Sequence, residues 1–290
     1  MKKNITNSVQ NRRIKYLDVA KGIGILLMLI GHQPTFIPSN FVNWIYSFHM
    51  PMFFIIAGFL HRQYGSISSS IIHYIKRLLI PYYLICIVMM WINMISTGRY
   101  DLFSYYIGET INGEGATHIE WFLLCLFWGN IIVDVVIKKI SKFDLQCLII
   151  TAGVFCSFFY SLIFENNLPL KIDSSLFSSG FIFVGYVLWN KTKYKESEMN
   201  GLWILLLGMV SILSCFAFKK IITDNTMILD IKGNVYSSVI LNYGVAISGS
   251  LFILELSKRI CSYCHKDLKS VKNIKKSLRM IYYFGGGGNT

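Results

Sequence analysis

The chain has 290 residues, of which 54% are hydrophobic and only 15% are charged, and its mean hydropathy is +0.50. These values exclude an ordinary soluble domain and indicate an integral membrane protein. The formal net charge of +13 does not require a nucleic-acid partner, because basic residues gather on the cytoplasmic side of membrane proteins and face anionic lipids there.

Apolar segments long enough to cross a hydrocarbon layer of roughly 30 Å recur along the chain. They are rich in Leu, Ile, Phe and Met and lack the two-residue alternation of barrel strands, so each predicts a membrane helix. We therefore expect an all-α, polytopic transmembrane helix bundle of about eight spans. These spans are predicted at residues 20–38, 43–60, 78–96, 119–137, 145–164, 174–189, 201–222 and 235–256.

The distribution of Lys and Arg predicts the orientation of the chain. With a cytoplasmic N-terminus, 22 of the 28 basic residues lie in cytoplasmic segments, five lie outside, and Lys21 lies within the first span. We expect a multi-pass protein of the inner (plasma) membrane with a cytoplasmic N-terminus. Its predicted parts are a basic cytoplasmic segment (1–16), a transmembrane domain (17–257) and a basic cytoplasmic tail (258–290).

The first predicted span, LDVAKGIGILLMLIGH (17–32), contains two polar side chains on one helix face. Lys21 and His32 are eleven residues apart, which is about 20° past three full helical turns and roughly 16 Å along the axis. Asp18 lies one turn before Lys21 and is placed to pair with it. A charged group inside a span is costly, so this pattern indicates a functional site.

The second predicted span, SFHMPMFFIIAGF (47–59), places His49 near the same depth as His32. The adjacent Pro51 removes a backbone hydrogen bond within the helix. A neutral imidazole takes and returns a proton near pH 7. We therefore predict a reaction site that contains His32 and His49 and is associated with the Lys21–Asp18 pair.

Four segments in order, the two above with KRLLIPYY (76–83) and EWFLLCLFW (120–128), resemble the membrane acyltransferase-3 family. The first-helix signature of that family is an Arg, ten residues and a His. Lys21 occupies the Arg position here and His32 the His position. The resemblance implies a bundle of about ten membrane helices that takes an acyl group from cytoplasmic acyl-CoA and delivers it to an acceptor at the outer side.

The resemblance also implies roles for individual residues. His32 would be the catalytic base and His49 would position or assist it. Lys76 and Arg77 suit the phosphates of acyl-CoA, although a basic cluster here also fits an ordinary cytoplasmic loop. Glu120 could orient a histidine or contact a sugar, and Trp121 could face the acceptor or anchor the helix at the interface.

Two further segments raise alternatives. CSYCH (261–265) has the spacing of a haem c attachment motif, but the predicted cytoplasmic location and the lack of a second ligand pair favour a chance spacing. We expect no metal and no bound cofactor, and acyl-CoA as a donor substrate. The polar segment 97–118 is predicted to be an outer loop that either covers a site or merely connects two spans.

The leading hypothesis is a membrane O-acyltransferase that moves an acetyl or other short acyl group to a hydroxyl of a cell-envelope polysaccharide or glycolipid. One alternative is an acyltransferase-like polysaccharide exporter. The other is an inactive, truncated family member, because the chain ends at YYFGGGGNT, where the family continues with further helices. An exporter should keep carboxylates along a path in the membrane. Asp134 and Glu255 are the candidates, and we expect both to be solvated near cytoplasmic helix ends.

Overall fold

The fold was analysed in a computed structural model of the 290-residue chain. The structure describes residues 14–33, 37–62, 64–115, 120–164, 168–192, 194, 199–221, 229–231, 235–236 and 238–285. Residues 1–13 of the predicted cytoplasmic segment and 286–290 of the predicted tail lie outside these ranges.

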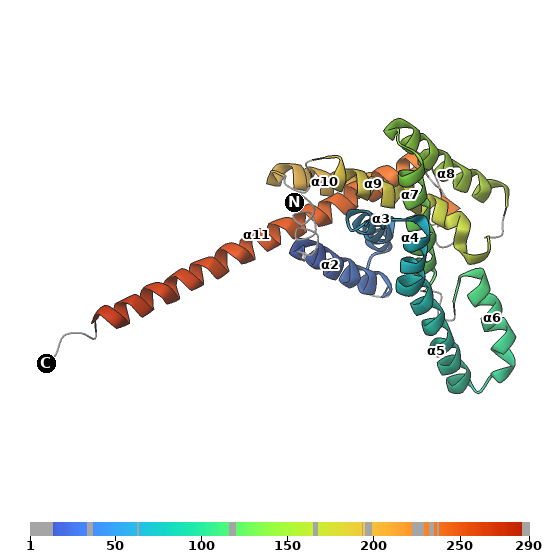
Figure 1. Ribbon diagram of the computed structural model, residues 1–290, viewed down its shortest axis with the longest axis horizontal. Helices are drawn as coiled ribbons and strands as arrows, with labels where there is room; N and C mark the ends of the chain where they lie inside the picture. Colours follow the sequence, from blue (N-terminus) through green and yellow to red (C-terminus); the bar gives the residue numbers. More distant parts are fainter. Residues whose placement is uncertain are drawn as a thin grey trace.

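The described chain is almost entirely helical, and each of the eight predicted spans coincides with a helix (Figure 1). Two short strands, β1 (Leu229–Asp230) and β2 (Val235–Tyr236), pair antiparallel with Leu229 opposite Tyr236. The last predicted span therefore begins later than expected. In chain order the helices are α2 (Lys15–Gly31), α3 (Ser39–Phe59), α4 (Ile67–Tyr74), the π-helix η1 (Ile75–Leu79), α5 (Ile80–Thr97), the 3-10 helix η2 (Tyr100–Leu102), α6 (Phe103–Asn112), α7 (Trp121–Lys139), α8 (Phe143–Ile163), the 3-10 helix η3 (Pro169–Lys171), α9 (Ile172–Asn190), α10 (Gly201–Ile221) and α11 (Val239–Gly285).

Six helices within the described residues are long and apolar enough to cross a membrane. Helix α2 is shorter, with 17 residues, and the apolar part of α10 is Gly201–Phe216. These helices confirm the prediction of a helical membrane protein. The count of eight spans and the cytoplasmic side of the N-terminus stay predictions. The six are Ser39–Phe59, Ile67–Thr97, Trp121–Lys139, Phe143–Ile163, Pro169–Asn190 and Val239–Cys264.

Helix α3 lies at the centre of the bundle, against α9, α2 and α11 (Figure 1). Its closest approach is to α9, where Gly58 and Gly185 bring the two backbones together. A Cβ atom on Gly58 would lie 2.0 Å from the carbonyl oxygen of Ile182, and one on Gly185 would lie 2.1 Å from that of Ile55. Small residues at a membrane helix crossing permit this close packing.

The segment predicted as a polar outer loop contains a helix, α6, so that prediction was wrong in this respect. Helix α6 packs beside α5 and forms a hairpin with it (Figure 1). The buried Tyr82 hydroxyl of α5 donates to the Thr110 carbonyl of α6 at 2.7 Å. Buried contacts of this kind hold the segment against α5, and its polar composition does not predict them.

Helix α11 runs without a break through the predicted boundary between residues 257 and 258. Its C-terminal half extends away from the other helices (Figure 1). The boundary was predicted from a change in composition, and a helix backbone continues through such a change because its hydrogen bonds are local.

Candidate active site

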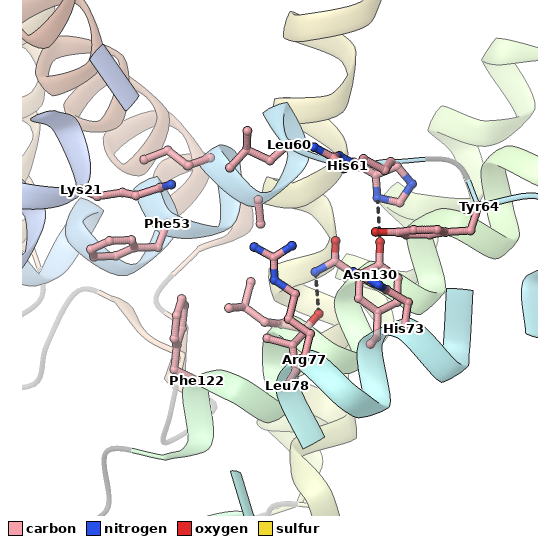
Figure 2. A pocket seen from close by; sticks show the side chains of 15 residues that line it. Lys21, Phe53, Leu60, His61, Tyr64, His73, Arg77, Leu78, Phe122 and Asn130 are labelled. Carbon is pink, nitrogen blue, oxygen red and sulfur yellow. Dashed lines mark hydrogen bonds between the residues drawn. The ribbon is translucent and has the colours of Figure 1, made fainter. Parts of the chain in front are cut away.

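A pocket of about 210 Å³ lies where α2, α3, α4, η1 and α7 meet (Figure 2). Three cationic side chains line it, and they come from three different elements of the chain: Lys21 from α2, Arg62 from the segment after α3, and Arg77 from η1. Apolar side chains also line it, among them Phe53, Phe122 and Leu126. The pocket thus combines a site for negative charge with a surface for an apolar group.

Lys21 forms the predicted pair with Asp18, at 3.9 Å between Nζ and Oδ1. Both side chains are 37% exposed, so this pair contributes little to stability. Lys21 nevertheless lines the pocket, which places the cation of the first-helix signature in contact with any ligand bound there.

Arg77 and Lys76 lie on η1, the π-helical segment between α4 and α5. Such segments occur frequently at functional sites. Both side chains are exposed, but that of Arg77 points into the pocket (Figure 2), whereas Lys76 does not line it. The structure therefore separates two neighbouring cations that the sequence treats alike.

A buried network of polar side chains begins at His61 and Tyr74, which line the pocket. The Nε2 atom of His61 lies 3.4 Å from Oδ1 of Asp134, with both side chains almost fully buried, and the Tyr74 hydroxyl lies 3.4 Å from Nδ1 of His61. Lys138 donates to the other Asp134 oxygen at 2.7 Å and to the Ser70 hydroxyl at 2.8 Å. The network ties the segment after α3 to both α4 and α7.

The His61 ring is held in its neutral form. Burial lowers the pKa of His61 below its usual 6.5, and the Asp134 carboxylate and the Asn130 side chain oppose this effect. A neutral His61 keeps one ring nitrogen as an acceptor, which suits the Tyr74 hydroxyl as donor to Nδ1.

One rim of the pocket consists of stacked rings. Tyr64 and His73 lie with their ring centroids 4.3 Å apart and their planes inclined by 30°. Both side chains line the pocket next to Arg62 and Arg77. Aromatic faces beside cations are suited to a flat heterocycle that carries phosphates.

His32 and His49 lie on either side of Tyr46. The His32 ring is 5.8 Å from the Tyr46 ring, and the Tyr46 ring is 5.2 Å from the His49 ring. His32 is exposed at the C-terminal end of α2, and His49 is buried in α3. The structure thus brings the two predicted histidines into one cluster that includes a tyrosine absent from the prediction.

Both histidines are oriented by the backbone of their own helix. Nδ1 of His32 lies 2.8 Å from the Met28 carbonyl, and Nδ1 of His49 lies 3.0 Å from the Ile45 carbonyl. A carbonyl oxygen only accepts, so Nδ1 carries the proton in each ring and Nε2 is left as the basic nitrogen.

Comparison with known proteins places this site in a family. The family model described as "Acyltransferase domain", of the acyltransferase-3 type, matches residues 14–274 and so spans the pocket and the histidine cluster. The chain belongs to the membrane acyltransferase-3 family. The resemblance of its four short segments is therefore confirmed over nearly the whole chain.

One curated relative of this acyltransferase-3 chain is nodulation protein NolL of Mesorhizobium japonicum. The two are 25% identical over 201 residues, which cover 62% of this chain and 50% of the relative. The chain thus spans about half the length of that relative. No solved structure matches the chain.

Two residues that the acyltransferase-3 resemblance proposed for substrate binding do not line the pocket. Glu120 and Trp121 are buried at the start of α7, with exposed fractions of 4% and 8%. Glu120 packs against Gly115, where an added Cβ atom would lie 2.6 Å from Oε2 of Glu120. The next residue, Phe122, does line the pocket.

Sequence reasoning missed His61 and His73, and it considered Asp134 only as a carboxylate on a transport path. It also expected Asp134 and Glu255 to be solvated, and this was wrong, because both are only 1% exposed. Each pairs with a lysine about one turn later in its helix, Asp134 with Lys138 and Glu255 with Lys258. An acid followed by a lysine at i+3 or i+4 predicts an ion pair, so the sequence could have indicated both of these pairs.

The CSYCH segment lies only partly within the described side chains, since that of His265 is outside them. Across the side chains that are described, all seven cysteines are free.

Proposed function

We propose that the protein is a membrane O-acyltransferase that moves an acetyl or other short acyl group from cytoplasmic acyl-CoA to a hydroxyl of a cell-envelope polysaccharide or glycolipid. The observation that carries this proposal is the pocket that joins Lys21, Arg62 and Arg77 to an apolar wall. Family membership supports the reaction class.

The pocket suits the chemistry of the donor. CoA carries several phosphates, which cations bind, and Arg77 offers a planar fork of donors. The stacked Tyr64 and His73 rings offer a face for the adenine. Phe53 and Phe122, with ring centroids 6.0 Å apart, form part of the apolar wall along which the pantetheine arm would lie.

The histidine cluster supplies the base in this proposal. His32 lies eleven residues beyond Lys21 on α2, roughly 16 Å along the axis, so the long arm of CoA must carry the thioester toward it. Because Nδ1 of His32 faces the Met28 carbonyl, Nε2 is the atom that takes a proton. Tyr46 of α3 contacts the His32 ring, and His49 contacts Tyr46.

The proposed step is a direct acyl transfer. Nε2 of His32 removes the proton of the acceptor hydroxyl while the oxygen attacks the thioester carbonyl carbon. The carbon–oxygen bond forms, the carbon–sulfur bond then breaks, and the CoA thiolate leaves and takes the proton back from His32. An acceptor reaches this end of α2 directly, since His32 is exposed.

The exporter alternative receives less support from the buried carboxylates. A transport path would use ionisable groups that change partners as the substrate passes. Asp134 and Glu255 are instead neutralised by Lys138 and Lys258 at 2.7 and 2.8 Å. Such fixed pairs suit anchoring of the helices.

The decisive experiment measures transfer of radiolabelled acetyl from acetyl-CoA to extractable surface glycan in cells that express the chain. His32→Ala is the test variant, and Gln33→Ala, an exposed neighbour, is the matched control. We expect label with the natural chain and Gln33→Ala and a loss of at least a hundredfold with His32→Ala. Equal label in all three would reject His32 as the base, and absence of label in all three would reject the proposed activity.

A further inference from the structure

A second, larger cavity of about 540 Å³ lies between α8, α9 and the start of α11. It plays no part in the proposed acyl transfer. Its lining is apolar except for Thr151 and the Tyr243 hydroxyl, and that hydroxyl donates to the Phe177 carbonyl at 2.5 Å. We call this cavity the α8 groove. It is lined by Phe143, Cys147, Ile150, Thr151, Val154, Phe155, Gly180, Phe183, Val184, Val187, Leu188, Val239, Ile240 and Tyr243.

The α8 groove opens on a helix face that other helices leave largely uncovered. Ile150, Val154 and Phe183 form a buried floor, whereas Phe143, Phe155 and Ile240 at the mouth are 39%, 37% and 77% exposed. Only 22% of the apolar window of α8 is buried within the structure. In a membrane helix, an apolar surface of this kind faces lipid.

The dimensions of the groove suit an alkyl chain. From Phe143 to Phe155 it follows α8 for roughly 18 Å, close to half of the roughly 30 Å hydrocarbon layer. An extended alkyl chain fits a groove of this length, and the volume of about 540 Å³ is spread along it.

One end of the groove is basic. Lys142 directly precedes Phe143 at the start of α8, and Lys191 lies 5.8 Å from the centroid of the Phe143 ring. Both lysines are exposed, and Asp144 is the acidic residue in the first turn of α8. Apart from Lys138, which pairs with Asp134, the segment KISKFD (139–144) and Lys191 together still have an excess of positive charge, which attracts anionic headgroups.

We propose that the α8 groove binds one anionic phospholipid, with an acyl chain along Phe143–Phe155 and the headgroup phosphate between Lys142 and Lys191. The lipid belongs to the leaflet at the Lys142 end of α8. It would complete the packing between α8 and α11, which share few contacts with each other.

The test uses the purified full chain in detergent with equal amounts of dioleoyl phosphatidylglycerol and dioleoyl phosphatidylcholine, and native mass spectrometry counts the bound lipids. We expect one tightly retained lipid and a preference for phosphatidylglycerol of roughly 25-fold, since each of the two lysines near the headgroup gives about a fivefold gain and the gains multiply. Lys142→Gln with Lys191→Gln should bring this preference close to one. Lys15→Gln, an exposed lysine on α2, should leave it unchanged.

A second pair of variants tests the groove itself. Thr151→Trp fills the mouth and should abolish retention of the lipid, while Leu213→Trp on the exposed face of α10 should not. The proposal is overturned if the natural chain binds both lipids equally, if the double lysine variant keeps the preference, or if Thr151→Trp retains the lipid. A dimer that Thr151→Trp dissociates would also overturn it and make the groove an interface between copies. The lysine variants are on the surface, so they remain informative if Thr151→Trp fails to fold.

Discussion

His61 Nε2 lies 3.4 Å from Asp134 Oδ1 although 73 residues separate them, and neither side chain is more than 1% exposed. The contact joins the segment after α3, which carries Arg62, to the middle of α7. Lys138 completes the charge balance on the second Asp134 oxygen. The position of the cationic side chains of the pocket therefore depends on a buried network, of which His61 and Tyr74 also line the pocket.

Asp134→Asn should destabilise the protein markedly. The substitution leaves the Lys138 ammonium near His61 without its counter-charge, and breaking a buried pair costs about 3 kcal/mol or more. We expect a clear fall in the thermal midpoint in detergent. Asp101→Asn is the matched control, because its pair with Arg99 is 60–65% exposed and should leave the midpoint unchanged. A shift as small as that of the control would show that the network is dispensable.

Acid should destabilise the natural chain through His61. Its pKa is lowered in the folded protein from the usual 6.5, so the unfolded chain binds the extra proton first as the pH falls. The contribution of neutral His61 to the stability of the folded protein is therefore complete above about pH 6.5 and is lost as the pH falls below that value. Between pH 7.5 and 5.5 the thermal midpoint should fall more steeply in the natural chain than in His61→Gln. Parallel curves for the two proteins would contradict this prediction.

Arg77→Gln should weaken binding of acyl-CoA while Lys76→Gln should not. Only Arg77 lines the pocket, and a hydrogen-bonded ion pair with phosphate contributes about 1.5–3 kcal/mol. We expect the donor KM to rise at least tenfold for Arg77→Gln with little change in kcat. If both substitutions had the same effect, the basic cluster would act only as a general positive surface.

Gly185→Ala should disrupt the crossing of α3 and α9. The added Cβ would meet the Ile55 carbonyl oxygen at 2.1 Å, and overpacking of this kind typically costs about 1–3 kcal/mol. Gly244→Ala is the control, because nothing lies within 4 Å of its added Cβ and alanine favours a helix by up to about 1 kcal/mol. We expect a lower thermal midpoint for the first variant and an equal or higher one for the second. Equal midpoints would show that the helices separate at little cost.

Much of the fold could be predicted because membrane helices are specified locally. A run of about 20 apolar residues satisfies its own backbone hydrogen bonds and meets lipid on its sides, so the six long apolar helices of the described residues were visible in the sequence. Helix α6 was not visible, because it is short and polar and is held by contacts such as Tyr82 to Thr110.

The candidate site divides in the same way. His32, His49 and the Lys21–Asp18 pair could be predicted because helical spacing alone places each on a face and at a depth, and Arg77 because it belongs to a recognisable segment. His61, His73 and Asp134 could not, because they lie on separate elements and their meeting depends on how α4 and α7 pack.

By itself, the sequence determined that the protein is a helical membrane protein and that it belongs to the acyltransferase-3 family, since apolar runs and short motifs are local properties of the chain. The tertiary structure alone decided that Arg77 and not Lys76 enters the pocket, that Tyr46 joins the two histidines, and that Asp134 is buried. The physical reason is that a side chain's neighbours are set by contacts between distant helices, and one helix turn changes which residue faces them.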